Sequence, residues 1–183
     1  AAVLTKLGSP LEIMDGIAVP DLRAGQVLVK LAYSGVCHSQ VMEANGARGP
    51  DHWLPHMLGH EATGRVVSIG SAVTKVSTGD LVVLGWIKGQ GCEAGGCQYL
   101  CDEVTINAGG VTTFSDHAVV SENRLVKLPK GVPLDLGVLF GCALPTGAGL
   151  VFNEVQPEVG SSVVVLDLVG LGYPHSLRPE LMM

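Results

Sequence analysis

Residues 58–83 read LGHEATGRVVSIGSAVTKVSTGDLVV, in which two short apolar runs flank a segment rich in turn residues. Arg65 to Ile69 and Leu81 to Leu84 are rich in Val, Ile and Leu, a composition typical of β-strands. The intervening GSAVTKVSTGD contains the glycines and small polar residues that favour turns. We expect two strands joined by this turn segment.

Three further β-type runs lie on either side of this stretch. Gln26 to Ser34 reads QVLVKLAYS and places Val, Val, Leu and Tyr on one face with a period of two. His117 to Ser121 and Arg124 to Leu128 are the other two runs. Residues 46–59 and 85–110 are Gly-rich, and we expect them to be long functional loops. The spacing predicts a mainly β protein with some helix, built as a small barrel or curled sheet.

The sequence pattern changes after Pro129. Pro133 lies where it can open a helix, because proline is favoured in the first helical turn. Thr146 to Asn153 predicts a second helical piece, which begins after a proline. We therefore expect a helical segment over residues 133–153.

A second domain is predicted to begin near residue 159. Residues 163–166 read VVVL, a short apolar run typical of buried parallel strands. Only 11 residues follow Gly172, whereas one strand–helix–strand unit needs about 30 or more. We expect one domain over residues 1–158 and the incomplete start of another over residues 159–183.

Composition excludes some classes of function. The chain has 11 Lys and Arg against 17 Asp and Glu, a net charge of -6, and no basic cluster that would favour nucleic acid as a partner. No secretory signal pattern is seen, which predicts a cytoplasmic location. The uncharged run over residues 136–152 contains Pro145 and is shorter than the roughly 20 residues of a membrane helix. Five cysteines, an odd number, favour metal binding or burial over a disulfide framework.

Cys37, His60 and Cys142 are the first candidate functional group. Each is ambiguous alone, because a single Cys is commonly a small buried hydrophobic residue and a single loop His is commonly solvated. Together, two thiolates and an imidazole make a three-ligand set for Zn²⁺ that leaves a fourth position for water or substrate. That open position is what a catalytic zinc requires.

Four motifs occur in the order of a known family: GVCHS at residues 35–39, the stretch at 58–83, FSDHAVVSENRLVKLP at 114–129 and GCALPTGAG at 141–149. On these motifs the chain resembles the zinc-dependent medium-chain alcohol dehydrogenases, over nearly its whole length up to Leu166. The resemblance implies the family's GroES-like catalytic domain, a partial β-barrel, followed by only the first strand of a Rossmann NAD(P)-binding domain.

The resemblance also implies roles for individual residues. Cys37, His60 and Cys142 match the ligands of one catalytic zinc, and Glu61 matches a carboxylate that can approach the metal. Ser39 matches the hydroxyl that passes the alcohol proton outward, although it could instead be an ordinary helix N-cap.

Other matched positions concern substrate and cofactor. Trp86 matches an aromatic wall of the substrate pocket, and Thr146 matches a residue that packs on the nicotinamide. The alternatives are that Trp86 fills the core and that Thr146 caps a helix. Gly170 and Gly172 match the cofactor's Gly-rich turn, but Asp167 stands where the family has a glycine.

Two positions depart from the family pattern beside the zinc ligands. Gln40 stands where an acidic residue usually orients the zinc-binding His, so support for His60 is expected to be weaker. Met42 stands where many members place the His that ends the proton relay. A relay from Ser39 would therefore need another route to water.

A second cysteine group lies where many members bind a structural zinc. Cys92, Cys97 and Cys101 provide three ligands, whereas closed structural sites need four. Asp102 or Glu103 could supply an oxygen ligand, but we expect no structural zinc here.

The resemblance implies oxidation of a small alcohol to an aldehyde or ketone with NAD or NADP. We expect this chain alone to bind zinc, to bind no nicotinamide cofactor and to be inactive, since most of the cofactor domain is missing. The alternatives are a non-catalytic metal-binding or interaction module and a zinc-free, quinone-reductase-like member of the same superfamily. Uncovered apolar surface over residues 134–166 also predicts self-association.

Overall fold

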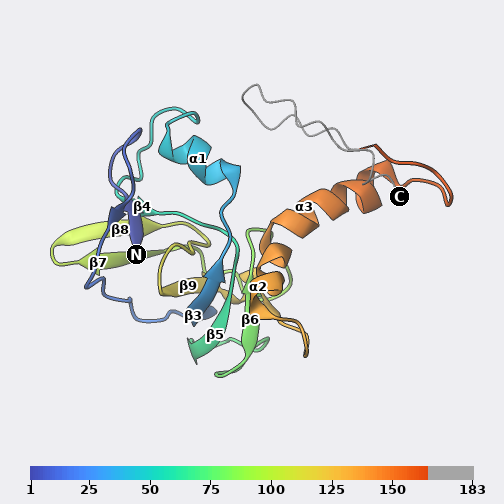
Figure 1. Cartoon of the computed structure of the whole chain (residues 1–183). Helices are drawn as coiled ribbons and strands as arrows, with labels where there is room; N and C mark the ends of the chain where they lie inside the picture. Colours follow the sequence, from blue (N-terminus) through green and yellow to red (C-terminus); the bar gives the residue numbers. More distant parts are fainter. Residues whose placement is uncertain (165–183) are drawn as a thin grey trace.

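The computed structural model describes residues 1–164, and Figure 1 shows two β-sheets from which a helical arm projects. The first sheet has the order β10-β6-β5-β3-β9, and every neighbouring pair is antiparallel. Its strands are β3 (Gln26–Ser34), β5 (Ala62–Ile69), β6 (Leu81–Leu84), β9 (His117–Ser121) and β10 (Leu125–Lys127). The five predicted runs therefore form one sheet, and the mainly β fold class is confirmed.

Strand β3 follows the predicted alternation only in its first half. Val27 and Val29 are fully buried, and Leu31 packs partly against the same core. Tyr33 is half exposed, contrary to the prediction. The register with β5 shifts between Leu31 and Tyr33, and such a bulge turns the following side chain away from the face of its neighbours.

The second sheet was not predicted. Its order is β2-β1-β4-β8-β7, with a parallel pair between β4 and β8. The strands are β1 (Ala2–Leu4), β2 (Glu12–Ile13), β4 (His56–Met57), β7 (Cys97–Cys101) and β8 (Val104–Ala108). The loop predictions for 46–59 and 85–110 are thus wrong in part, because β4 lies in the first segment and the β7–β8 hairpin in the second.

The two sheets share a hydrophobic core. Tyr99 of β7 and Ile106 of β8 pack with Val119 of β9, which belongs to the first sheet. The Val119 N–H donates a 2.8 Å hydrogen bond to the buried Tyr99 hydroxyl. This hydrogen bond joins the β7–β8 hairpin to the first sheet. It explains why part of the Gly-rich segment 85–110 has a regular structure.

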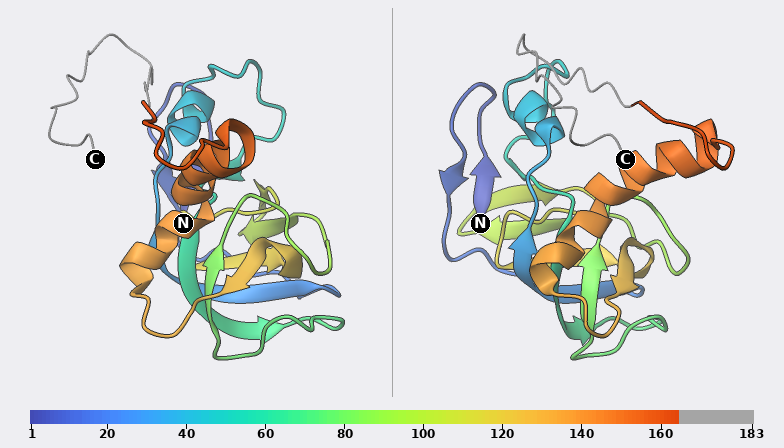
Figure 2. Two further views of the ribbon diagram at one scale, coloured as in Figure 1. Left: turned by 90° about the vertical axis from the view of Figure 1, so that its right-hand side faces the viewer. Right: turned by 45° about the vertical axis from the view of Figure 1, so that its right-hand side comes forward.

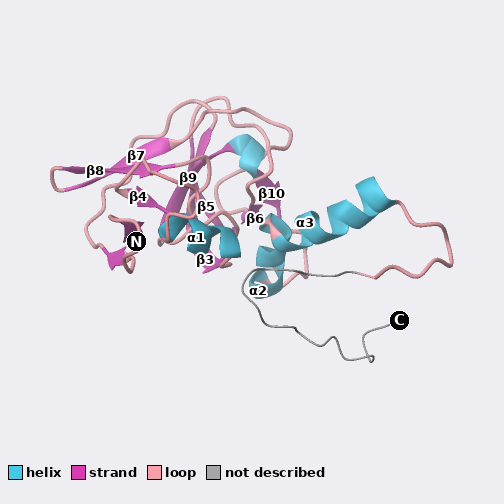
Figure 3. Cartoon of the chain, turned by 90° about the horizontal axis from the view of Figure 1, so that it is seen from above, coloured by secondary structure: helices cyan, strands magenta, loops and turns pink. Residues whose placement is uncertain are grey.

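The helical elements of the described chain are short. They are α1 (His38–Ala44), the 3-10 turns η1 (Glu122–Arg124) and η2 (Val138–Gly141), α2 (Leu134–Gly137), α3 (Ala143–Gly149) and the π-helix η3 (Leu150–Val155). The second helical piece begins at Ala143, three residues before the predicted start. Figures 2 and 3 show α3 extending away from the sheets.

Residues at the end of the described region bear on the second-domain prediction. Val163 and Val164 are described and are not in a strand, while the rest of the predicted strand and Gly170 and Gly172 lie outside the described residues. No single helix within residues 1–164 is long and apolar enough to cross a membrane. Only Leu134–Gly141 and Ala143–Val155 taken together, with a 52° bend between them, reach that length and composition.

Candidate metal centre

Cys37 is placed by the junction between β3 and α1. It is the N-cap of α1, with extended backbone angles, and its N–H donates to Gln40 Oε1 at 2.8 Å. The Gln40 N–H in turn donates to the Cys37 carbonyl at 3.1 Å. These bonds close the first turn of α1 as a capping box between Cys37 and Gln40, and so fix the Cys37 backbone.

His60 lies in the short connection between β4 and β5. Gly59 before it has a φ of +92°, and a Cβ there would overlap Thr113 Oγ1, so only glycine fits. His60 Nδ1 is 2.5 Å from Gln40 Nε2, and His60 Nε2 is buried without a hydrogen-bond partner among the described residues. This is the nitrogen that a bound metal ion would contact.

Cys142 comes from the break between η2 and α3. It is buried, and the preceding Gly141 lies so close to the Leu84 carbonyl and to Glu61 that a Cβ would overlap both. Close packing on β6 therefore brings the helical segment to the sheet. Cys142 reaches the same side as Cys37 and His60 because of this contact.

The structure brings the three predicted ligands together. The ligand atoms of Cys37, His60 and Cys142 all lie within 4.8 Å of one another. Burial lowers the pKa of His60, which favours the neutral imidazole that a metal requires. A hydrogen bond from the Ser39 side chain lowers the pKa of Cys37, while burial raises that of Cys142. The donor set and the unpartnered His60 nitrogen fit a zinc ion.

Ser39 and Glu61 also adjoin the centre. Ser39 is the second residue of α1, so the alternative that it is the N-cap is wrong, because Cys37 occupies that position. Glu61 is buried, and its Oε2 accepts the Ala143 N–H at 3.3 Å. A Cβ at Gly35 would overlap Glu61 Oε1, so this carboxylate is tightly enclosed.

Trp86 and Thr146 lie near the Cys142 segment. Gly85 packs against the Gly141 carbonyl, which places the next residue, Trp86, beside this segment. Trp86 is 49% exposed and is not a core residue. Thr146 lies inside α3 with its hydroxyl 3.8 Å from Cys142 Sγ, and it is not a helix cap. Their predicted contacts with substrate and nicotinamide stay predictions.

The second cysteine group has separate surroundings. Cys97 Sγ lies 3.8 Å from the Val119 carbonyl, and Cys101 Sγ lies 3.4 Å from the Asp15 carbonyl. Cys92 packs against Gly25. Within the described part of the chain all three are free thiols, and the absence of a structural zinc stays a prediction.

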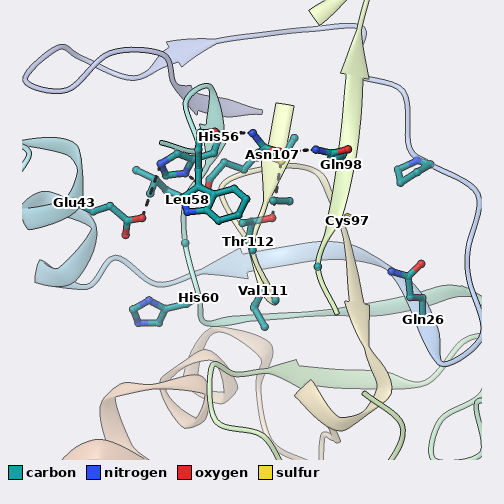
Figure 4. A pocket seen from close by; sticks show the side chains of 18 of the residues that line it. Gln26, Glu43, His56, Leu58, His60, Cys97, Gln98, Asn107, Val111 and Thr112 are labelled. Atoms are coloured by element: carbon teal, nitrogen blue, oxygen red, sulfur yellow. Dashed lines mark hydrogen bonds and ion pairs between the residues drawn. The ribbon is translucent and has the colours of Figure 1, made fainter. Parts of the chain in front are cut away.

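A cavity of about 800 Å³ adjoins the centre and is shown in Figure 4. His60 lines it together with Glu43 and His56. Neither Glu43 nor His56 was predicted from the sequence to be a functional residue. Glu43 and His56 are 13 positions apart, a spacing that matches no metal-binding motif. The one usable signal in the sequence was that His56 precedes the predicted ligand His60 by four residues.

Residues 23–130 match a family model described as alcohol dehydrogenase GroES-like domain. The chain belongs to this family. Over 94% of its length this GroES-like chain is 31% identical to alcohol dehydrogenase class-3 of Cereibacter sphaeroides. Over the same share it is 33% identical to S-(hydroxymethyl)glutathione dehydrogenase of Synechocystis. The resemblance inferred from the four motifs is thereby confirmed.

Solved structures support the same assignment. An alcohol dehydrogenase zinc-binding domain protein from Burkholderia ambifaria shares 28% identity, with a TM-score of 0.72 over 88% of the GroES-like chain and 50% of that protein. Benzyl alcohol dehydrogenase from Acinetobacter calcoaceticus shares 29% identity, with a TM-score of 0.69 over 84% and 47%. The chain spans about half the length of the curated relatives it matches.

Proposed function

We propose that this chain is the zinc-binding catalytic domain of an alcohol dehydrogenase. The complete enzyme would convert a small-molecule alcohol to an aldehyde or ketone with NAD or NADP, and a cytoplasmic location is part of the same proposal. The observation that carries it is the convergence of Cys37, His60 and Cys142 around an unpartnered His60 nitrogen. The family assignment supports it.

The protein groups around the centre have distinct chemical capacities. Zinc held by Cys37, His60 and Cys142 would act as a Lewis acid that polarises the oxygen of an alcohol. Ser39 Oγ, in the first turn of α1 and hydrogen-bonded to the Cys37 thiol, is a hydroxyl beside the centre that would accept the alcohol proton. Its neighbour at 3.3 Å is Gln40 Nε2, which can only donate, so a proton leaving Ser39 must pass to water rather than to Gln40.

Metal analysis tests the zinc site directly. Cys37→Ser or His60→Ala should lower the zinc content of the purified chain by about one zinc per chain, because two remaining protein ligands seldom hold zinc tightly. Cys101→Ser, which changes a thiol outside the centre, is the matched control and should leave the zinc content unchanged. A zinc content that neither ligand change lowers contradicts the proposal.

The expected inactivity of the isolated chain is a separate prediction. Hydride transfer requires nicotinamide clamped beside the alcohol by a parallel sheet that this chain supplies only in its first predicted strand. Titration with NADH, followed by fluorescence, should show no saturable binding. Saturable binding abolished by Thr146→Trp would contradict this and place the cofactor on α3.

Zinc content also separates the two alternative functions. A zinc-free reductase would leave the Cys37, His60 and Cys142 side chains without a joint purpose. A non-catalytic metal-binding module would keep the zinc. It would show no dehydrogenase activity even when this chain is fused to the C-terminal half of one of its relatives.

A further inference from the structure

A second group of metal-ligating side chains lies outside the Cys37–His60–Cys142 centre. The ligand atoms of Glu43, Asp51 and His56 all lie within 4.8 Å of one another. His56 Nε2 is 2.7 Å from Asp51 Oδ2 and 3.9 Å from Glu43 Oε1. Figure 4 shows the Glu43 carboxylate directed at the His56 ring.

The tautomer of His56 is fixed by its other nitrogen. His56 Nδ1 is 3.0 Å from the Met57 carbonyl oxygen, which can only accept, so Nδ1 carries a proton. Nε2, on the other side of the ring, faces Asp51 Oδ2 at 2.7 Å and Glu43 Oε1 at 3.9 Å, in a side chain that is only 6% exposed.

One metal ion can contact both carboxylates and the imidazole. A proton on His56 Nε2 points in one direction and serves Asp51 at 2.7 Å, while Glu43 Oε1 stays 3.9 Å from the ring and Glu43 Oε2 lies 3.8 Å from Arg48 Nη1. A metal ion binds in several directions at once. Ligand atoms around a tetrahedral zinc with bonds of about 2.0–2.2 Å are roughly 3.3–3.6 Å apart, a spacing between the two observed distances.

Contacts outside the cluster hold two of the ligands in place. The hydrogen bond from His56 Nδ1 to a backbone carbonyl is the usual second contact of a metal-binding imidazole. Asp51 Oδ1 accepts the Trp53 N–H at 2.8 Å, which turns Oδ2 toward His56. Glu43 and His56 line the 800 Å³ cavity, so water can reach a fourth position.

We propose that Glu43, Asp51 and His56 bind a divalent cation of the zinc type, with water from the cavity as the remaining ligand. The cation would join α1, which carries Glu43, to β4, which carries His56, across the intervening loop of residues 45–55. This site is independent of the proposed dehydrogenase function, because it shares no ligand with the thiolate centre.

Cobalt(II) separates the two sites. In the full chain with Cys37→Ser and Cys142→Ser, which removes both thiolates, titration by calorimetry should still show one Co²⁺ per chain. Its visible spectrum should have d–d bands but no thiolate-to-cobalt charge-transfer band. Adding His56→Gln should lower the affinity by at least about tenfold. His52→Gln, an exposed histidine of the same loop, should leave it unchanged.

The other outcomes overturn the proposal. If the double Cys variant binds no Co²⁺ or Zn²⁺ at concentrations that saturate the wild-type chain, His56 is only a hydrogen-bond partner of Asp51. Glu43→Gln provides a second measurement if His56→Gln does not fold, because Glu43 is one-third exposed and a milder change. Cation binding that Glu43→Gln and Asp51→Asn both leave unchanged also rules out this site.

Discussion

Both ends of the Gln40 side-chain amide make hydrogen bonds. Its Oε1 accepts the Cys37 N–H, so its amino group is the end that faces His60 Nδ1 at 2.5 Å and donates to it. The ring proton of neutral His60 then resides on Nε2, the atom that zinc requires as a free lone pair. Zinc binding therefore requires the Gln40 amide to turn over and give up its bond to Cys37.

Gln40→Glu should remove this conflict and tighten zinc binding. A carboxylate accepts from both the Cys37 N–H and a His60 Nδ1–H, and such outer contacts change metal affinity by about 10–100-fold. Competition against a chromophoric chelator measures the change. Gln90→Glu, at an exposed position, is the charge-matched control. Equal affinities for Gln40→Glu and wild type would show that the amide turns over at no cost.

The sequence predicted the residues of the thiolate centre but not their surroundings. Cys37, His60 and Cys142 could be found because each lies in a motif of the family. The Gln40 substitution could also be seen, but its double contact depends on the N-cap geometry of α1, which no spacing reveals. Asp51 and His56 are only five positions apart, but they meet because the loop before β4 turns back on itself, which no residue pattern predicts.

At the scale of elements, Glu122 of η1 joins the β5–β6 loop to the β6–β7 loop. This buried side chain accepts the N–H groups of Thr74 and Lys75 on Oε1 and that of Cys92 on Oε2. Burial alone would raise the pKa of Glu122, but these backbone donors hold it below its ordinary value. The carboxylate thus replaces hydrogen bonds that the loops cannot make among themselves.

Glu122→Gln should destabilise the fold by about 2–4 kcal/mol, because an amide group would face backbone donors with an N–H of its own. Urea unfolding followed by circular dichroism measures the loss. Glu103→Gln, in the exposed β7–β8 turn, removes the same charge and should change stability little. A loss no larger than in that control would mean that the loops find other partners.

Acid should weaken the same region. Lys88 and nearby hydrogen-bond donors lower the pKa of Glu93 to about 2, and the pKa of Glu122 is also lowered. A carboxyl with a depressed folded-state pKa contributes stability that is complete above its unfolded value of about 4.5 and is lost as the pH falls further. Melting temperatures should therefore decline from about pH 5 toward pH 2. A flat profile over that range would contradict the role of these two carboxylates.

Prediction of the elements succeeded where apolar runs were uninterrupted. The first sheet could be identified from its Val-rich strands, and the helical segment from its prolines. The β7–β8 hairpin was missed because glycines flank it and its inward residues, Tyr99 and Ile106, become buried only against Val119 of the other sheet. Strands of two or three residues such as β2 and β4 exist through pairing, not through local preference.

At the scale of the whole molecule, the helical arm from Leu134 to Val155 carries uncovered apolar side chains. The exposed ones are Leu136, Leu139, Phe140, Leu144, Leu150, Phe152 and Val155. Solitary apolar side chains are normal on a surface, but a contiguous set on one projecting arm favours association. We expect the isolated chain to self-associate through this arm.

Light scattering during size-exclusion chromatography tests the expectation. The mass of the wild-type chain should exceed that of a monomer and rise with concentration, and Phe152→Asp should lower it. Ile13→Asp on β2 is a matched control, since Ile13 is 76% and Phe152 74% exposed. A wild-type monomer at every concentration, or equal effects of the two changes, would contradict association through the arm.

The position of Cys142 on the helical segment has a consequence for chain connectivity. Cys37 and Cys142 are 105 positions apart, so a metal ion bound to both would act as a cross-link that closes most of the domain into one loop. A covalent link of that span restricts the unfolded chain by about 4–5 kcal/mol in the simplest entropy treatment. A zinc link is reversible, so its contribution to the free energy of unfolding depends on the concentration of free zinc. The supply of metal would therefore set how stably the helical arm packs on the sheets.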